Sequence, residues 1–210
     1  CLFVYFSYLV AKERFYQYDF DTTVKFQDHI PRFFDLFFSL FSVFGSAEIT
    51  TIVIIALGII LLFRKFWIAA GSLSLFFISV AIEVYGKVFV HHPGPPHLFY
   101  RGVIDFDFPS HYVHSQYSYP SGHMTRAAFI VAFLVTWIFL KWHWSAKILF
   151  IPGLLGFLTI MFISRIYLGE HWFSDVFGGL LLGSSFGIIS AITIPSRLSH
   201  TSRMDSPNIH

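Results

Sequence analysis

The sequence has 210 residues, of which 55% are hydrophobic and 20% aromatic, while only 12% are charged. Soluble globular domains carry about 25% charged residues, so this composition excludes a disordered chain, a nucleic-acid-binding arm and a solvated coiled coil. The net charge of +2 is too small to predict a nucleic-acid partner, and the single cysteine, Cys1, excludes an intramolecular disulfide. The remaining class is an integral membrane protein, long enough for about six spans.

The N-terminal segment combines a short apolar stretch with a longer polar one. The chain starts with Cys1 rather than methionine, and residues 1–11 are apolar but too few to cross a bilayer. We therefore expect them to be the remnant of a first span whose start is missing. Residues 12–46 are predicted to be an extracytoplasmic segment, in which the Phe-rich stretch Arg32–Phe44 favours an interfacial helix.

The predicted core, residues 47–194, consists of apolar stretches long enough to cross a membrane, and Pro195 ends the last of them. Their expected bounds are Ala47–Phe63, Phe66–Val90, Met124–Leu140, Ala146–Ile163 and Val176–Ile194. A polar tail covers residues 195–210. This pattern predicts an all-α fold, a polytopic membrane helix bundle, with residues 1–210 forming a single domain.

Basic residues in the short connections predict the orientation of the spans, because cytoplasmic loops carry an excess of Lys and Arg. The residues that define this face are Arg64, Lys65, Lys141, Lys147, Arg197 and Arg203. The opposite, extracytoplasmic face then holds residues 12–46, 91–123 and 164–175. We expect an integral protein of a bacterial-type inner or plasma membrane, with its chemistry on the extracytoplasmic side.

One candidate for chemistry lies between the last two spans. If the final helix begins near Glu170, His171 and Asp175 lie four residues apart on one face. The carboxylate would then hold the Nδ1 proton and leave Nε2 as a nucleophile or base, while Arg165 offers a forked donor to a phosphate. The alternative is an ordinary helix start with a favourable acidic residue and an interfacial histidine.

A second candidate is the run Pro120-Ser121-Gly122-His123, directly before an apolar span. Ser121 can cap that helix, and Gly122 lets backbone N–H groups approach a ligand closely. A helix start of this kind binds anions, and His123 would lie beside the anion as an acid. The alternative is a plain serine cap followed by a loop histidine.

Further ionisable residues precede this run. Lys87 follows Glu83 by one turn at the far end of a long span, which indicates either an ion pair with a snorkelling lysine or a polar site. Five histidines follow, namely His91, His92, His97, His111 and His114. Their spacing fits no metal-binding motif, so we predict no metal at these residues. The 164–175 segment, the 120–123 run and Lys87 all lie at extracytoplasmic ends of spans. Together they provide cations, a helix start that can bind an anion, and two histidines, a combination that suits phosphoryl transfer.

The residues from Phe66 to Ile194 resemble the type-2 phosphatidic acid phosphatase superfamily. Its signature comprises Lys-x6-Arg-Pro, Pro-Ser-Gly-His and Ser-Arg-x5-His-x3-Asp. The second part is complete at 120–123, and the third is complete as Ser164, Arg165, His171 and Asp175. The first retains Lys87 and Pro95, but Gly94 stands at its arginine position.

The resemblance implies a six-helix bundle with a cofactor-free, metal-independent mechanism. His171 would attack phosphorus and form a phosphohistidine, and Asp175 would orient it. His123 would protonate the leaving group and later activate water. The residues implied in phosphate binding are Lys87, Ser121, Gly122 and Arg165.

Gly94 cannot supply the contact that the family's arginine makes with the phosphate. Two residues are candidates for that role: Arg126, one turn into the following span, and His92, two positions before Gly94. Arg126 could instead be a snorkelling interfacial residue, and Arg101 is a weaker candidate.

The favoured function is hydrolysis of a lipid phosphate or isoprenoid diphosphate in the bilayer. Two alternatives stay open at this point. One is a phosphotransferase that moves a lipid headgroup on the same fold, and the other is a non-catalytic membrane protein that binds or transports phospholipid.

Overall fold

The computed structural model describes residues 2–104, 117–141 and 143–194, and the regular secondary structure of these residues is entirely helical. This confirms the predicted all-α class. The predicted tail 195–210, and with it Pro195, Arg197 and Arg203, lies outside the described residues. The same holds for Cys1, His111 and His114.

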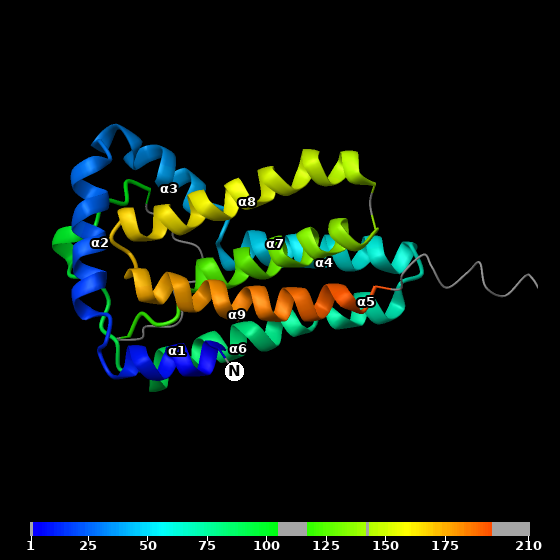
Figure 1. The fold of residues 1–210 in the computed structure, drawn as a ribbon, viewed down its shortest axis with the longest axis horizontal. Coiled ribbons are helices and arrows are strands. Elements are labelled where there is room, and N and C mark those ends of the chain that lie inside the picture. The colour runs from blue at the N-terminus through cyan, green and yellow to red at the C-terminus, as the bar shows by residue number, and fades with distance from the viewer. Residues whose placement is uncertain (1, 105–116, 142, 195–210) are drawn as a thin grey trace, which may run out of the picture.

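The N-terminal part forms short helices around one end of the bundle. They are α1 (Leu2–Ala11), α2 (Tyr16–His29), the 3-10 turn η1 (Arg32–Phe34) and α3 (Asp35–Val43). Helix α2 crosses the end of the bundle and contacts α8 and α9 (Figure 1). The predicted helix at Arg32–Phe44 is therefore present as η1 and α3.

Helix α4 (Ala47–Phe63) follows α3 after a tight bend. The Oγ atom of Ser46 accepts a hydrogen bond from the Ile49 N–H and thereby caps the start of α4. The stretches Arg32–Val43 and Ala47–Phe63 meet at 45° and together are apolar and long enough for one broken span. The bend places Gly45 against the ring of His123 in the first turn of α7.

The remaining helices are α5 (Trp67–Ser72), α6 (Leu75–Phe89), α7 (Gly122–Lys141), α8 (Trp144–Tyr167) and α9 (Phe173–Ile192). Within the described residues, four continuous stretches are long and apolar enough to cross a membrane: Trp67–Phe89, Gly122–Lys141, Lys147–Tyr167 and Phe173–Ile192. These helices confirm the prediction of an integral membrane protein.

Several helix bounds differ from the sequence prediction. The span expected at Phe66–Val90 is present as Trp67–Phe89, and a short turn within it separates α5 from α6. Helix α8 continues past the predicted end at Ile163 to Tyr167, so Arg165 lies in its last turn rather than in a loop. Helix α9 begins at Phe173, not near Glu170, because the Asp175 carboxylate accepts the Trp172 N–H and caps the helix there.

A row of glycines brings α9 against the backbone of α7. Gly179, Gly183 and Gly187 recur every four residues, and a Cβ on Gly183 would lie 2.0 Å from the Thr125 carbonyl oxygen. Small residues at this spacing let two membrane helices approach closely. At the same end of the pair, the Ser121 N–H donates to the Asp175 carbonyl oxygen at 3.0 Å. The starts of α7 and α9 are therefore held side by side.

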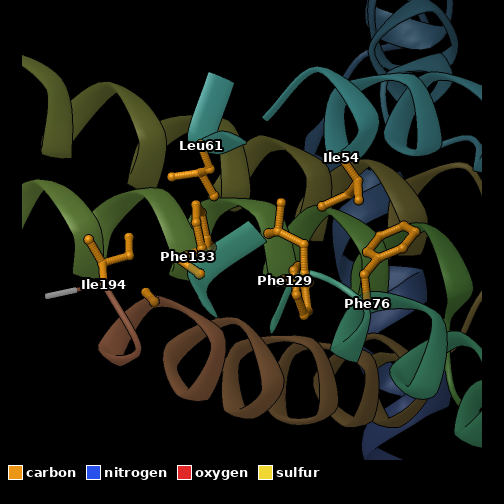
Figure 2. Packing of buried hydrophobic residues seen from close by; sticks show 9 residues of the cluster. Ile54, Leu61, Phe76, Phe129, Phe133 and Ile194 are labelled. Carbon is orange, nitrogen blue, oxygen red and sulfur yellow. The ribbon is translucent and has the colours of Figure 1, made fainter. Parts of the chain in front are cut away.

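The apolar core lies deeper in the bundle. Figure 2 shows aromatic and aliphatic side chains from α4, α6 and α7 packed together with Ile194, which follows α9. Phe129 and Phe133 belong to this cluster and lie about two and three turns into α7. The core fixes the helices relative to one another and leaves their polar ends free to form a site.

Candidate active site

The predicted site residues gather where the ends of four helices meet. Lys87 comes from the last turn of α6, His123 from the first turn of α7, and Arg165 from the last turn of α8. The turn between α8 and α9 carries His171, and the first turn of α9 carries Asp175. Residues far apart in the sequence thus form one polar cluster.

The turn that carries His171 depends on Gly169. Its φ is +67°, and a Cβ on it would lie 2.2 Å from the Phe99 carbonyl oxygen. Only glycine fits this left-handed conformation at such a close approach. His171 therefore precedes α9 and does not lie on its face, which corrects the expected helical spacing with Asp175.

His171 nonetheless faces the Asp175 carboxylate, with 3.4 Å between Nδ1 and Oδ2. Oδ2 also accepts hydrogen bonds from the Ser118 hydroxyl at 2.6 Å and the Trp172 N–H at 3.0 Å. Asp175 is fully buried, so these donors stabilise it where water cannot. The carboxylate is in position to orient the imidazole.

Burial, followed by the nearby Arg165 charge, holds the pKa of His171 well below its ordinary value of 6.5. The ring is therefore neutral near pH 7, the state that a nucleophile requires. His123 is buried as well, and the same three cations act electrostatically on both rings: Arg165, Arg126 and Lys87.

Glu83 links two of these cations. Its Oε1 lies 3.2 Å from the Lys87 ammonium nitrogen, and its Oε2 lies 3.1 Å from Nη1 of Arg126. Arg126 also donates from Nε to the Gly45 carbonyl oxygen at 3.2 Å. The ion pair expected between Glu83 and Lys87 is thus present, and Arg126 points into the protein rather than snorkelling to the membrane surface.

Arg165 is completely buried and uses both ends of its guanidinium fork. Nη1 donates to the Ser42 hydroxyl, and Nη2 pairs with the half-buried Glu170 carboxylate. The ion pair with Glu170 therefore occupies Nη2 of Arg165, a donor that could otherwise bind a phosphate.

Ser121 differs from its expected capping role. Its Oγ is buried and has no hydrogen-bond partner among the residues that the structure describes. Gly122 beside it has no room for a side chain, because a Cβ would lie 2.1 Å from Oε1 of Glu83. A hydroxyl without a partner, next to the N–H groups of a helix start, is free to bind an incoming oxygen atom.

The residues considered in place of the family's arginine have different surroundings. Arg126 lies among the site cations, whereas Arg101 stacks on the Tyr167 ring at 5.2 Å and stays outside the cluster. His92 is buried behind Asp175, with 3.5 Å between its Nε2 and Oδ1 of the carboxylate. A Cβ on Gly94 would make only an ordinary contact with Ser118.

Several polar contacts of the site come from residues that the sequence analysis did not single out. Ser42 lies in the last turn of α3, and Gly45, in the bend between α3 and α4, packs against the His123 ring. The Ser118 hydroxyl donates a hydrogen bond to Asp175, and Asp19 accepts one from the neighbouring Ser174. No local motif marks these residues, because each acts across a long stretch of chain.

Comparison with known proteins places the chain in a family. The model of the PAP2 superfamily, the type-2 phosphatidic acid phosphatases, matches residues 65–198, so the chain belongs to that superfamily. The family resemblance that the motifs indicated is confirmed.

Two curated relatives and two crystal structures are similar to this chain. Undecaprenyl-diphosphatase YbjG, as the Escherichia coli protein is named, is 31% identical over 125 residues, and phosphatidylglycerophosphatase B of Bacillus subtilis is 40% identical over 74 residues. These matches cover 59% and 33% of the chain, and 57% and 35% of the relatives' lengths. The chain thus matches only part of each relative.

The fold is shared with a transmembrane PAP2-type phosphatidylglycerolphosphate phosphatase of Bacillus subtilis, with a TM-score of 0.72, 19% identity and 90% coverage of both chains. It is also shared with LpxE of Aquifex aeolicus, with a TM-score of 0.60, 24% identity, and coverage of 82% of this chain and 93% of the other. These likenesses confirm a helical membrane fold of the PAP2 type.

Proposed function

We propose that this protein is a membrane phosphatase that removes a terminal phosphate from a lipid phosphate or isoprenoid diphosphate. The observation that carries the proposal is the pair of buried imidazoles, His123 and His171, which share three cations. The Asp175 carboxylate faces the His171 ring. The names of the curated relatives, an undecaprenyl-diphosphatase and a phosphatidylglycerophosphatase, support the substrate class.

The geometry suits a two-step phosphoryl transfer. Nε2 of His171 attacks phosphorus, the bond from phosphorus to the leaving oxygen breaks, and His123, which the bound phosphate anion keeps protonated, gives its proton to that oxygen. His123 then takes a proton from water, the water oxygen bonds to phosphorus, and the bond to His171 breaks. In this mechanism Asp175 orients the ring by accepting the Nδ1 proton, since its Oδ2 lies 3.4 Å from that nitrogen.

The phosphate oxygens would be bound by Lys87, Arg165, the free Ser121 hydroxyl and the backbone N–H of Gly122. Fixed donors of this kind stabilise the charge that develops in the transition state by several kcal/mol. A site lined by cations repels a divalent metal ion, so we propose a mechanism without metal. Activity that survives EDTA supports this, and loss of activity on chelation contradicts it.

Arg126 takes over the role of the arginine that Gly94 cannot supply. Its charge acts on both histidines, and Glu83 fixes its position from the neighbouring helix. We expect Arg126→Met to lower kcat about 100-fold or more, the usual cost of losing one such donor. Gly94→Arg should restore part of that loss because Gly94 has room for a side chain. Arg101→Met is the matched control and should leave kcat unchanged.

The site is proposed to face the extracytoplasmic side of a bacterial-type inner or plasma membrane. Residues 1–210 are proposed to form one domain of the six-span family pattern, in which the first span is truncated. The basic ends of α4 and α7, with Arg64, Lys65 and Lys141, lie at the end of the bundle opposite α2 (Figure 1). This arrangement agrees with a cytoplasmic location of the basic end. The lipid tail would remain in the bilayer while its headgroup enters the site.

A panel of lipid phosphates and diphosphates tests the activity directly. Purified protein should release inorganic phosphate from at least one member, and His171→Ala should abolish release. His143→Ala, an exposed histidine at the start of α8, is the matched control. Turnover by His171→Ala at the wild-type rate contradicts the mechanism. Transfer of label to a second lipid, without free phosphate, would instead identify a phosphotransferase.

A further inference from the structure

A second buried polar cluster lies behind Asp175 and takes no part in the steps above. Asp19 of α2, Ser174 of α9 and His92, which follows α6, have exposed fractions of 2%, 0% and 6%. Their side chains meet between three segments of the chain. Buried polar groups of this kind persist only when they are mutually satisfied.

Asp19 ties α2 to the start of α9. Its Oδ1 accepts the Ser174 N–H at 2.8 Å, and its Oδ2 accepts the Ser174 hydroxyl at 2.8 Å. The first bond satisfies a helix-start N–H that has no partner within α9. Asp19 thus caps α9 from another helix, one residue before Asp175.

The same hydrogen bonds define which nitrogen of His92 carries a proton. Ser174 Oγ uses its only hydrogen on Asp19, so it accepts from His92 Nε2, which lies 3.1 Å away. Burial lowers the pKa of His92 to about 4, so the ring carries one proton near pH 7, and that proton is on Nε2. Burial also raises the pKa of Asp19 to about 6, although the bonds from Ser174 oppose this change.

The Nε2–H of His92 also lies within reach of Asp175. It is 3.5 Å from Oδ1, a buried oxygen with no hydrogen-bond partner among the described residues. Oδ2 of the same carboxylate already has two donors and faces His171. A small rotation of the His92 ring therefore supplies the donor that Asp175 lacks.

We propose that His92, held in place by Asp19 through Ser174, is a positioning residue that orients and stabilises the Asp175 carboxylate during phosphoryl transfer. This inference rests on the proposed phosphatase function. When His171 bonds to phosphorus, its ring becomes cationic and relies on the anionic carboxylate beside it. A hydrogen bond from His92 to Oδ1 keeps that carboxylate ionised and correctly turned, so its contribution falls on kcat rather than on substrate binding.

The test compares two substitutions of His92 on a substrate that the wild-type protein hydrolyses. His92→Leu removes the donor and should lower kcat about 10- to 100-fold, the usual range for a residue that orients a catalytic group, with KM within about threefold. His92→Gln keeps an N–H donor and should stay within about fivefold of the wild-type kcat. His91→Leu, its exposed neighbour, is the matched control and should match the wild type.

A wild-type kcat in His92→Leu overturns the inference, and so does an equal loss of kcat in the leucine and glutamine variants, which would indicate packing alone. Asp19→Asn provides a second test if the leucine variant does not fold. Its amide oxygen still accepts the Ser174 N–H, but the charge is gone, so kcat should fall about threefold or more while Tm changes little. An unchanged kcat in Asp19→Asn also overturns the inference. Failure of the phosphatase proposal itself is distinct, because it appears as no phosphate release by the wild type.

Discussion

Replacing Gly183 with alanine should slow the reaction although Gly183 lies outside the site. The new Cβ would lie 2.0 Å from the Thr125 carbonyl oxygen and 2.9 Å from both Ala128 Cβ and the Phe129 nitrogen. Two of these atoms belong to the α7 backbone and cannot rotate away. An ordinary carbon–oxygen contact of about 3.3 Å requires the two helices to separate by about 1.3 Å at this level.

That separation would move one half of the site relative to the other. His123 and Ser121 belong to the start of α7, whereas Asp175 belongs to α9 and His171 to the turn before it. A misplacement of about 1 Å costs on the order of 100-fold in rate, and overpacking costs about 1–3 kcal/mol of stability. We therefore expect kcat to fall about 100-fold and Tm to fall by several degrees.

Phosphate release and thermal unfolding in detergent measure the two effects. Gly156→Ala on α8 is the matched control, because nothing lies within 4 Å of its Cβ position. Gly187→Ala separates stability from catalysis. Its Cβ would lie 2.3 Å from the Phe129 carbonyl oxygen, one turn farther from the site, so Tm should fall similarly but kcat less. Wild-type kcat and Tm in Gly183→Ala would refute the proposed close packing.

Three further predictions concern the site itself. Asp175→Asn should lower kcat by about 1,000-fold or more with little change in KM, measured by phosphate release, because the His171 tautomer is no longer fixed. Glu170→Gln should lower KM about fivefold by freeing Arg165 for phosphate, and an unchanged KM would contradict competition between the two anions. The His171 ring should remain neutral as the pH falls through 6.5, because its pKa is lowered; NMR titration of labelled histidine against His171→Gln measures this, and protonation at or above pH 6.5 would contradict it.

Most of the fold follows from the sequence because membrane spans need long apolar helices, whatever their partners. The long apolar stretches identified α7, α8 and α9 to within a few residues at most ends. The errors occur where polar side chains decide a helix end. Asp175 caps α9 by accepting the Trp172 N–H, and the turn at Gly169 lies just before this cap.

The motifs likewise indicate a phosphate site without knowledge of how the helices pack, since the residue types and spacing of Ser121, His123, Arg165 and His171 are local features of the sequence. For Arg126 the sequence allows two orientations, toward the site or toward the membrane surface. The ion pair with Glu83 selects the first. The sequence does not predict this ion pair, because Glu83 and Arg126 lie far apart in the chain.

The amino-acid sequence alone specifies a helical membrane protein and predicts a phosphate site from motifs at the ends of its spans. How these ends meet depends on tertiary packing. Asp19, Ser42 and His92 lie far along the chain from the side chains they contact, so no periodicity or spacing predicts that they come together. Their positions depend on the close packing of α7 and α9 and on α2 crossing the end of the bundle.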